Sequence, residues 1–248
     1  MTARYVYSDE FMSALGLWQR GWREDKDERL SLTAALQAAI ANLPSLPPEA
    51  VEVPEWCYRK RFLVPNNPQN GGDFWPFFWE GEITEGIVSW STDYDYCKVI
   101  FKPDPRPGTI ACVFRHRPVS AEVILNIAAL WSRKDFAEAA DAFVTRGGPA
   151  ASGLKHFRDT QSEIILNAPL SMDEVFAFCG QVPSLGQLCE AAGISTPDDE
   201  DELWQRLVEA NYLPTMPFWL EQDAAQRAID RARIVIEERL RGYLKPKV

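Results

Sequence analysis

Short strand-like runs occupy the middle of this chain, whereas helical patterns occupy both of its ends. The runs are rich in β-branched and aromatic residues and are bounded by proline, glycine or polar residues, which is typical of strands. The prolines of residues 43–48 (LPSLPP) predict an extended linker in front of these runs, because consecutive prolines end helices. Several short strands between helical ends favour an α+β fold.

This pattern divides the 248 residues into an N-terminal helical segment (1–50), a central core (51–180) and a C-terminal helical segment (181–248). We expect one large domain, or one domain with a helical appendage. Strands are predicted within residues 51–64, 86–93, 109–114, 160–166 and 175–178, and a strand or a helix over 123–131. Helices are predicted within residues 8–42, with Ser8 as the first cap and a second start at Ser31 or Thr33, and over 93–101, 133–145, 185–191, 201–210 and 222–243. Residues 25–29 and 147–160 are expected to be polar connections, and the aromatic cluster 74–79 is too interrupted for a strand.

The charge of the chain is acidic overall but unevenly spread. A net charge of −10 argues against a protein whose whole surface binds nucleic acid. From Lys98 to Lys134, however, the sequence has seven basic residues and only two acidic ones. The strongest acidic run is residues 198–202. A local basic surface suits an anionic small ligand and leaves a nucleic-acid substrate open.

Several common classes of protein are disfavoured by what the sequence lacks. Its five cysteines form no CxxC pair and there are only two histidines, so we expect reduced thiols and no metal site. A P-loop, a GxGxxG turn and a GxSxG elbow are missing. No apolar run approaches the roughly 20 residues that span a bilayer, and the first ten residues do not resemble a signal peptide. We therefore expect a cytoplasmic protein without membrane partners.

Three short motifs follow one another through the central core. They are Tyr58-Arg59 on a strand, Ser89-Trp90-Ser91 at the end of a strand, and Gln161-Ser162-Glu163 where a loop enters a strand. Alternation along the last strand predicts that Gln161 and Glu163 lie on the same side. Each motif alone also has a plain structural explanation. Arg59 is explained as a surface residue of a strand, Ser89 and Ser91 as turn hydroxyls that bond their own backbone, and Glu163 as an exposed charge at a strand edge.

Taken in this order, the motifs resemble the arginine–serine–glutamate pattern of mono-ADP-ribosyltransferases of the cholera-toxin-like class. The Gln-x-Glu spacing is similar to that of the subgroup with the Rho-modifying exoenzymes and the pierisin-like DNA-modifying toxins. The resemblance spans roughly residues 56–178 and does not cover the two helical ends. It implies a split β-sandwich with flanking helices, NAD as a substrate and no metal.

The resemblance also implies a role for each motif residue. Glu163 would stabilise the positive charge that develops on the ribose when nicotinamide leaves NAD, as carboxylates do in glycoside hydrolysis. Arg59 would bind the NAD phosphates, for which a guanidinium fork is well suited, with Arg61 on the same strand face as the alternative. Ser89, and after it Ser91, would orient the carboxylate and the nicotinamide. Trp90, between the two serines, is counted with them among the residues that would bind NAD. It stands where a threonine is common, although other branches of the family carry an aromatic residue there.

Two further residues would face the acceptor of the ADP-ribose. By resemblance, Gln161 would contact the acceptor and help to place its nucleophile. Phe157 falls where related enzymes carry an aromatic residue on a substrate-recognition loop, although it is equally explained as a residue that packs this loop down.

The expected function is therefore an intracellular mono-ADP-ribosyltransferase from a bacterium or phage, acting as a toxin or a defence effector. Its acceptor would be a nucleic-acid base or a protein side chain, and a neutralising antitoxin or immunity protein is a possible partner. Two alternatives stay open. The first is an NAD glycohydrolase, which uses water as the acceptor, and the second is a non-catalytic binding or scaffold protein with the same fold.

Overall fold

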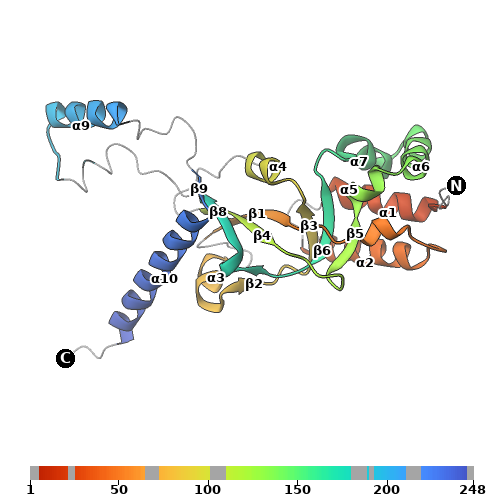
Figure 1. The fold of residues 1–248 in the computed structure, drawn as a ribbon, viewed down its shortest axis with the longest axis horizontal. Helices are drawn as coiled ribbons and strands as arrows, with labels where there is room; N and C mark the ends of the chain where they lie inside the picture. Colours follow the sequence, from red (N-terminus) through yellow and green to blue (C-terminus); the bar gives the residue numbers. More distant parts are fainter. Residues whose placement is uncertain are drawn as a thin grey trace. The chain divides into compact units, whose positions relative to one another are not determined.

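The computed structural model describes residues 6–21, 26–64, 73–100, 110–179, 189, 193–210 and 219–244, and shows an α+β protein (Figure 1). The helices, with two 3-10 turns, are α1 (Asp9–Arg20), α2 (Lys26–Ala41), η1 (Pro48–Val51), α3 (Phe74–Glu80), α4 (Tyr94–Val99), α5 (Ile127–Trp131), α6 (Lys134–Thr145), α7 (Pro149–Phe157), η2 (Met172–Glu174), α9 (Pro197–Glu209) and α10 (Asp223–Leu244). The strands are β1 (Cys57–Leu63), β2 (Glu82–Ile83), β3 (Ile87–Ser91), β4 (Ile110–His116), β5 (Val123–Asn126), β6 (Glu163–Asn167), β7 (Leu170–Ser171), β8 (Val175–Cys179) and β9 (Leu220–Glu221).

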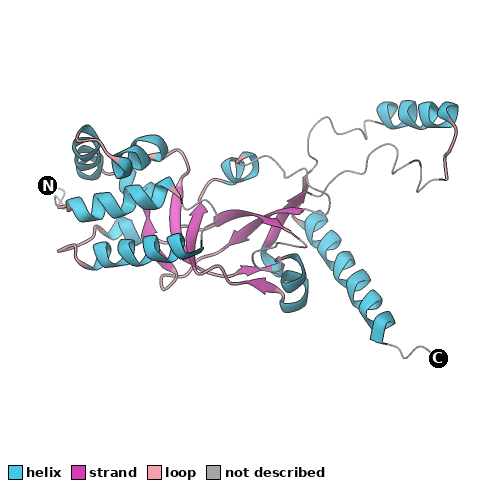
Figure 2. Ribbon diagram, turned by 180° about the vertical axis from the view of Figure 1, so that it is seen from behind, coloured by secondary structure: helices cyan, strands magenta, loops and turns pink. Residues whose placement is uncertain are grey.

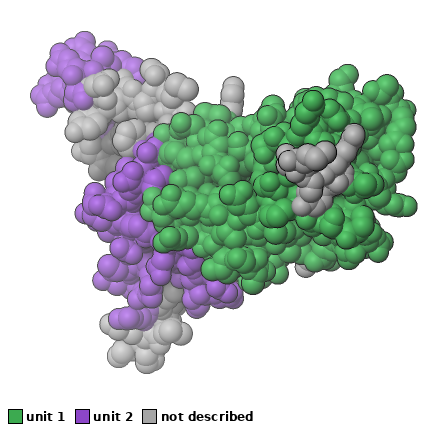
Figure 3. Space-filling view, turned by 45° about the vertical axis from the view of Figure 1, so that its right-hand side comes forward, with its two compact units in different colours: residues 1–59, 84–100, 115–170 green, residues 60–83, 101–114, 171–248 purple. Residues whose placement is uncertain are grey.

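Within these described residues, seven strands form a mostly antiparallel sheet, drawn in magenta in Figure 2. Their order is β5-β6-β3-β1-β4-β8-β9, and β2 pairs with β7. The chain separates into two compact units (Figure 3). Unit 1 comprises residues 1–59, 84–100 and 115–170, and unit 2 comprises residues 60–83, 101–114 and 171–248. Every residue of the three motifs lies in unit 1.

The core of unit 1 combines the N-terminal helices with the strands that carry the motifs. Helix α1 begins at the predicted cap, because the Ser8 side chain accepts a hydrogen bond from the Phe11 backbone N–H at 3.1 Å. Its apolar residues Phe11, Leu15 and Trp18 recur at helical spacing and are buried. They pack in one cluster with residues of β5, α5 and β6, including Ile165. The N-terminal helices therefore share a core with the strands of the site.

Two glycines allow α1 to cross α7 at very short range. A Cβ atom on Gly16 would lie 2.1 Å from the backbone oxygen of Ala150, and one on Gly153 would lie 1.9 Å from the backbone oxygen of Gly16. No larger residue fits at either position without moving a backbone. This crossing sets the position of the C-terminal turn of α1, which carries Trp18 and Gln19.

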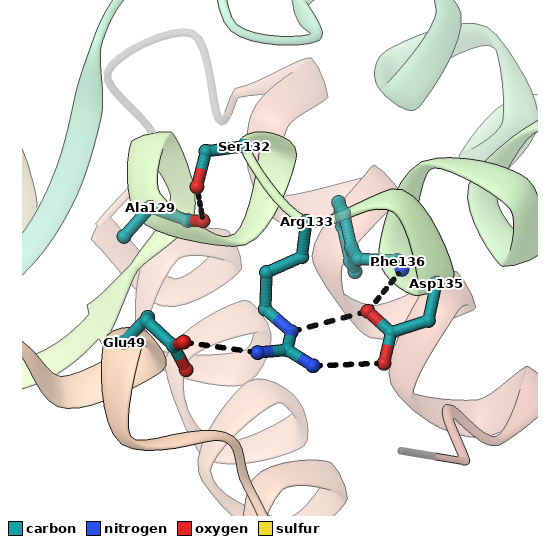
Figure 4. A network of polar contacts seen from close by, with 6 residues as sticks. All are labelled: Glu49, Ala129, Ser132, Arg133, Asp135 and Phe136. Carbon is teal, nitrogen blue, oxygen red and sulfur yellow. Dashed lines mark hydrogen bonds and ion pairs between the residues drawn. The ribbon is translucent and has the colours of Figure 1, made fainter. Parts of the chain in front are cut away.

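A buried arginine joins η1 to the start of α6 (Figure 4). The Arg133 guanidinium donates two parallel hydrogen bonds to Asp135, at 3.1 and 3.0 Å, and a third to Glu49 at 3.0 Å. Its side chain is 9% exposed. Because every one of these bonds joins charged groups, the network fixes the entry into α6.

Unit 2 has its own packed centre. Phe77 of α3 meets Phe114 of β4 edge-to-face, with ring centroids 5.7 Å apart. The Gln226 side chain of α10 donates to the backbone oxygen of Val175 at 2.7 Å, which ties the long helix to β8. In the described part of the chain, no helix is both long enough and apolar enough to cross a bilayer.

Most predicted elements are confirmed, and several expectations were wrong. Residues 149–157, expected in a polar loop, form α7. Residues 74–80, for which no element was predicted, form α3. Residues 26–29, expected as a connection, belong to α2. The ambiguous stretch 123–131 contains both alternatives in turn, β5 and then α5. The helix predicted over 185–191 falls on residues that are not described, apart from Cys189.

Candidate functional site

The three motifs come together on three neighbouring strands of unit 1. In the antiparallel ladder, Ser91 of β3 is paired with Tyr58 of β1 on one side and with Glu163 of β6 on the other. Directly paired residues of antiparallel strands present their side chains on the same face. Ser89 is two residues from Ser91 and shares this face, so the sheet brings the serines and Glu163 together.

Glu163 is an interior residue rather than the exposed edge charge that its motif alone allowed. Strand β6 lies between β5 and β3, and Glu163 is only 3% exposed. Its Oε1 atom accepts hydrogen bonds from Ser89 Oγ at 2.5 Å and from Trp18 Nε1 at 3.1 Å. Its Oε2 atom accepts from Gln19 Nε2 at 3.1 Å. Both oxygens of this carboxylate are thus held by protein donors.

The electrostatics of Glu163 result from two opposed effects. Burial raises the pKa of the carboxyl above its ordinary value, while the hydrogen bonds from Ser89, Gln19 and Trp18 lower it. Among the described residues, no lysine, arginine or histidine forms an ion pair with Glu163. Tyr96 of α4 is an electrostatic neighbour, and burial is the main reason that its own pKa rises to about 12. The carboxylate is therefore surrounded by neutral donors.

Arg59 is connected to this cluster through Ser89. Its Nη1 atom donates to the backbone oxygen of Ser89 at 2.6 Å, and its Nε atom bonds Glu85 at 2.6 Å. Its Nη2 atom bonds none of the described residues and keeps its donors for another partner. The alternative, Arg61, pairs with Asp73 at 2.6 Å and belongs to unit 2. Arg59 is the arginine that contacts the serine motif.

The other two residues of the serine motif have different surroundings. The Ser91 hydroxyl donates to the backbone oxygen of Gln161 at 2.7 Å and accepts from the Asp93 N–H at 3.0 Å, so it fixes the two turns beside the site. Trp90 is buried, and its ring centroid lies 5.5 Å from that of His116. Alternation along β3 directs Trp90 away from the face that carries Ser89.

Two expectations about the approach to β6 were wrong. The strand begins at Glu163 and Ser162 has a left-handed φ of 45°, so strand alternation does not extend back to Gln161. The Gln161 side chain forms no hydrogen bond with a described residue, and only its backbone oxygen contacts the serine motif. Phe157, expected on a loop, is the last residue of α7 and packs edge-to-face on His156.

Sequence reasoning missed Trp18 and Gln19, the two residues of α1 that bond the carboxylate. They are separated from Glu163 by 145 and 144 positions, outside the region that the resemblance covers. In the sequence, Trp18 continues the apolar stripe of a helix and reads as core. Gln19 follows it without any distinguishing pattern, so no local signal identifies the pair.

This arrangement is an anionic centre whose described members differ in exposure. Trp18 and Gln19 are buried, whereas Ser89 is half-buried, so the exposed side of the cluster is the side of Ser89. A fixed carboxylate in such surroundings stabilises a positive charge that develops beside it, because little water is present to screen the interaction. Among the described residues, no three histidine, cysteine, aspartate or glutamate side chains come close enough to hold a metal ion.

Comparison of the chain with protein-family models, with curated protein sequences and with solved structures found no match.

Proposed function

We propose that this chain is a mono-ADP-ribosyltransferase that cleaves NAD and transfers ADP-ribose to a macromolecule. One observation carries the proposal: the Ser89 hydroxyl bonds Glu163 while the Ser89 carbonyl accepts from Arg59. The arginine, serine and glutamate that the sequence pattern selected thus form one connected group on three adjacent strands. The antiparallel α+β architecture is compatible with a split β-sandwich of the transferase type, which forms part of this proposal.

The proposed reaction breaks the bond between C1′ of the ribose and the nicotinamide nitrogen. The electron pair of this bond leaves with nicotinamide, and positive charge develops on the ribose. Glu163 stabilises that charge electrostatically, from the side of the cluster where Ser89 is half-buried. A nucleophile of the acceptor then forms a bond to C1′ and loses its proton to solvent. NAD is consumed as a substrate.

Arg59 has the remaining donors that binding of a phosphate requires. Its ion pair with Glu85 and its bond to the Ser89 carbonyl fix the plane of the guanidinium, and its Nη2 atom is left to donate. A planar cation that is held in place loses little freedom when it binds a phosphate oxygen. The pyrophosphate of NAD would lie here, with the adjoining ribose directed toward Ser89 and Glu163.

A second function, NAD glycohydrolase, is favoured by the surroundings of Gln161. The side chain that was expected to place the acceptor is not part of the strand that carries Glu163, because this strand begins at Glu163 and Ser162 has a left-handed φ of 45°. A site of this kind would pass ADP-ribose to water. In that case the protein would deplete NAD without modifying a macromolecule.

Both functions are tested by one labelling experiment. The purified chain is incubated with NAD, labelled on its adenylate part, and with cell lysate, and samples are then treated with protease, RNase or DNase. Macromolecular label that is lost only after nuclease treatment identifies a nucleic-acid acceptor, and label lost after protease identifies a protein. Release of nicotinamide without macromolecular label identifies a glycohydrolase. If nicotinamide release does not exceed that of a reaction without the protein, both proposals are wrong and a non-catalytic role is left.

A transferase of this kind acting on the cell's own nucleic acid or protein would damage its host. A neutralising antitoxin or immunity protein is therefore part of the proposal, as is action in the cytoplasm as a toxin or defence effector.

A further inference from the structure

Helix α1, which lies outside the three motifs, supplies two of the three donors that hold Glu163. Trp18 Nε1 bonds Oε1 and Gln19 Nε2 bonds Oε2, and both donors are buried. The single N–H of Trp18 also donates to Ser89 Oγ at 3.2 Å, so it is shared between the serine and the carboxylate. The serine hydroxyl therefore directs its own proton to Glu163. All three neighbours act as donors.

The orientation of the Gln19 amide is fixed by a second contact. Its Nε2 atom also donates to the backbone oxygen of Arg158 at 3.4 Å, so the nitrogen, rather than the oxygen, must face this side. The Oε1 atom is buried and bonds none of the described residues. With the amide reversed, Oε1 would face the Arg158 carbonyl, and two acceptors would oppose each other. Gln19 is thus set to donate to a carboxylate.

We propose that Trp18 and Gln19 are positioning residues of the active site, which keep the Glu163 carboxylate ionised and correctly oriented. This inference rests on the proposed function for its catalytic meaning. A protonated carboxyl carries a hydrogen of its own, which would compete with the three donors that already point at its oxygens. An ionised carboxylate only accepts, so it can bond all three donors. Gln19, from the N-terminal helix, thus takes the place beside the catalytic carboxylate that the sequence pattern gave to Gln161.

The two donors are held by packing rather than by a movable loop. Gly16 and Gly153 bring α1 and α7 into backbone contact, and Arg158 follows directly after α7. Phe11 and Leu15 of α1 are fully buried in the core of unit 1. The α1–α7 crossing therefore positions Gln19 against both the Arg158 carbonyl and Glu163.

The charged and titratable groups around Glu163 do not replace these donors. Tyr96 of α4 stays neutral at the pH values at which Glu163 titrates, since the pKa of Tyr96 is raised to about 12. The Arg158 guanidinium bonds Asp141 and lies over the Trp131 ring, and only its carbonyl faces Gln19. Trp18, Gln19 and Ser89 are uncharged. Loss of one of the α1 donors should therefore leave the burial of Glu163 less compensated, and its pKa should rise further.

The two glutamines allow a matched test that needs no substrate. Protein with ¹³C-labelled glutamate side chains is titrated by NMR as wild type, Gln19→Met and Gln161→Met, with Glu163→Gln to identify the signal of Glu163. Methionine keeps the length of glutamine and removes its donor. We expect Gln19→Met to move the Glu163 titration to higher pH and Gln161→Met to leave it in place. An unmoved titration in Gln19→Met, or an equal shift in both variants, would overturn the proposal.

Trp18→Phe provides a second variant that keeps an aromatic side chain and removes the Nε1 donor together with one ring of the indole. In Trp18→Phe, the titration of Glu163 should also move to higher pH. If it does not move, the proposal is contradicted, even if Gln19→Met does not fold. The acid limb of NAD cleavage should shift in the same direction, with a rate about tenfold below wild type at the acidic end. The NMR titration is made without NAD. Its result on the two α1 donors is therefore valid even if the chain does not cleave NAD.

Discussion

Ser89 Oγ donates a 2.5 Å hydrogen bond to Glu163 Oε1 across two adjacent strands, although the residues are 74 positions apart in the chain. The backbone pairing of β3 with β6 places them there. The same serine accepts, through its carbonyl, a hydrogen bond from Arg59. Ser89 is therefore the residue through which the arginine and glutamate motifs are joined.

Removal of the Ser89 hydroxyl should impair catalysis, whereas removal of the Ser91 hydroxyl should impair folding. Ser89→Ala leaves Oε1 with only one donor, and we expect kcat for nicotinamide release to fall about ten- to a hundredfold. Ser91→Ala loses bonds to Gln161 and Asp93 and should lower the free energy of unfolding by about 1 kcal/mol. Steady-state kinetics and denaturant unfolding of both variants check this, and a larger kcat loss in Ser91→Ala would reverse the assignment.

Arg59→Lys should weaken NAD binding, because an ammonium group does not reproduce the fork that bonds Glu85 and Ser89 and that, in the proposed function, also binds a phosphate. We expect KM for NAD to rise about tenfold or more, with a smaller change in kcat. Arg61→Lys is the matched control, because Arg61 pairs with Asp73 in unit 2. If Arg61→Lys raised KM more than Arg59→Lys, the phosphate site would belong to Arg61.

Glu163 should make stability depend on pH. Burial raises its folded-state pKa above the ordinary value of 4.5, so the folded chain binds this proton more tightly than the unfolded chain. Its contribution to stability is therefore lost as the pH rises from about 4.5 through the folded-state pKa. The unfolding free energy of wild type minus that of Glu163→Gln should fall over this window and level off above it. A difference independent of pH in denaturant titrations would show that the carboxyl does not titrate as inferred.

The crossing of α1 and α7 should tolerate no side chain at Gly153. Gly153→Ala places a Cβ atom 1.9 Å from the Gly16 oxygen, and we expect a loss of about 1–3 kcal/mol in unfolding free energy. Activity should also fall, because the displaced α1 carries Gln19 away from Glu163. Ser152→Ala, at the exposed neighbouring position, is the control. Equal melting temperatures for the two variants would argue against a tight crossing.

The parts of the fold that local sequence determines were predicted well. Ser8 caps α1, and the strands around Arg59, Ser89 and Glu163 form where alternation and turn residues place them. Helix α7 was missed because its sequence, PAASGLKHF, is short and rich in small residues. Those small residues serve the close crossing with α1, which is a long-range requirement that local propensity does not contain.

The site was predictable only in the part that its motifs encode. Glu163, Ser89 and Arg59 lie on neighbouring strands and were identified by their order in the chain. Gln161 was placed by strand alternation, which fails at the left-handed Ser162. Trp18 and Gln19 reach Glu163 only through the tertiary packing of α1, so no spacing in the sequence relates them to it.

The central claim is that the chain cleaves NAD with Glu163 as the catalytic carboxylate. The release of nicotinamide tests this claim most directly. Wild type and Glu163→Gln, matched for folding by circular dichroism, are incubated with NAD, and free nicotinamide is measured over time. The account predicts release by the wild type and a rate lower by about a hundredfold or more in Glu163→Gln. Equal rates in the two proteins, or no release by the wild type, would contradict it.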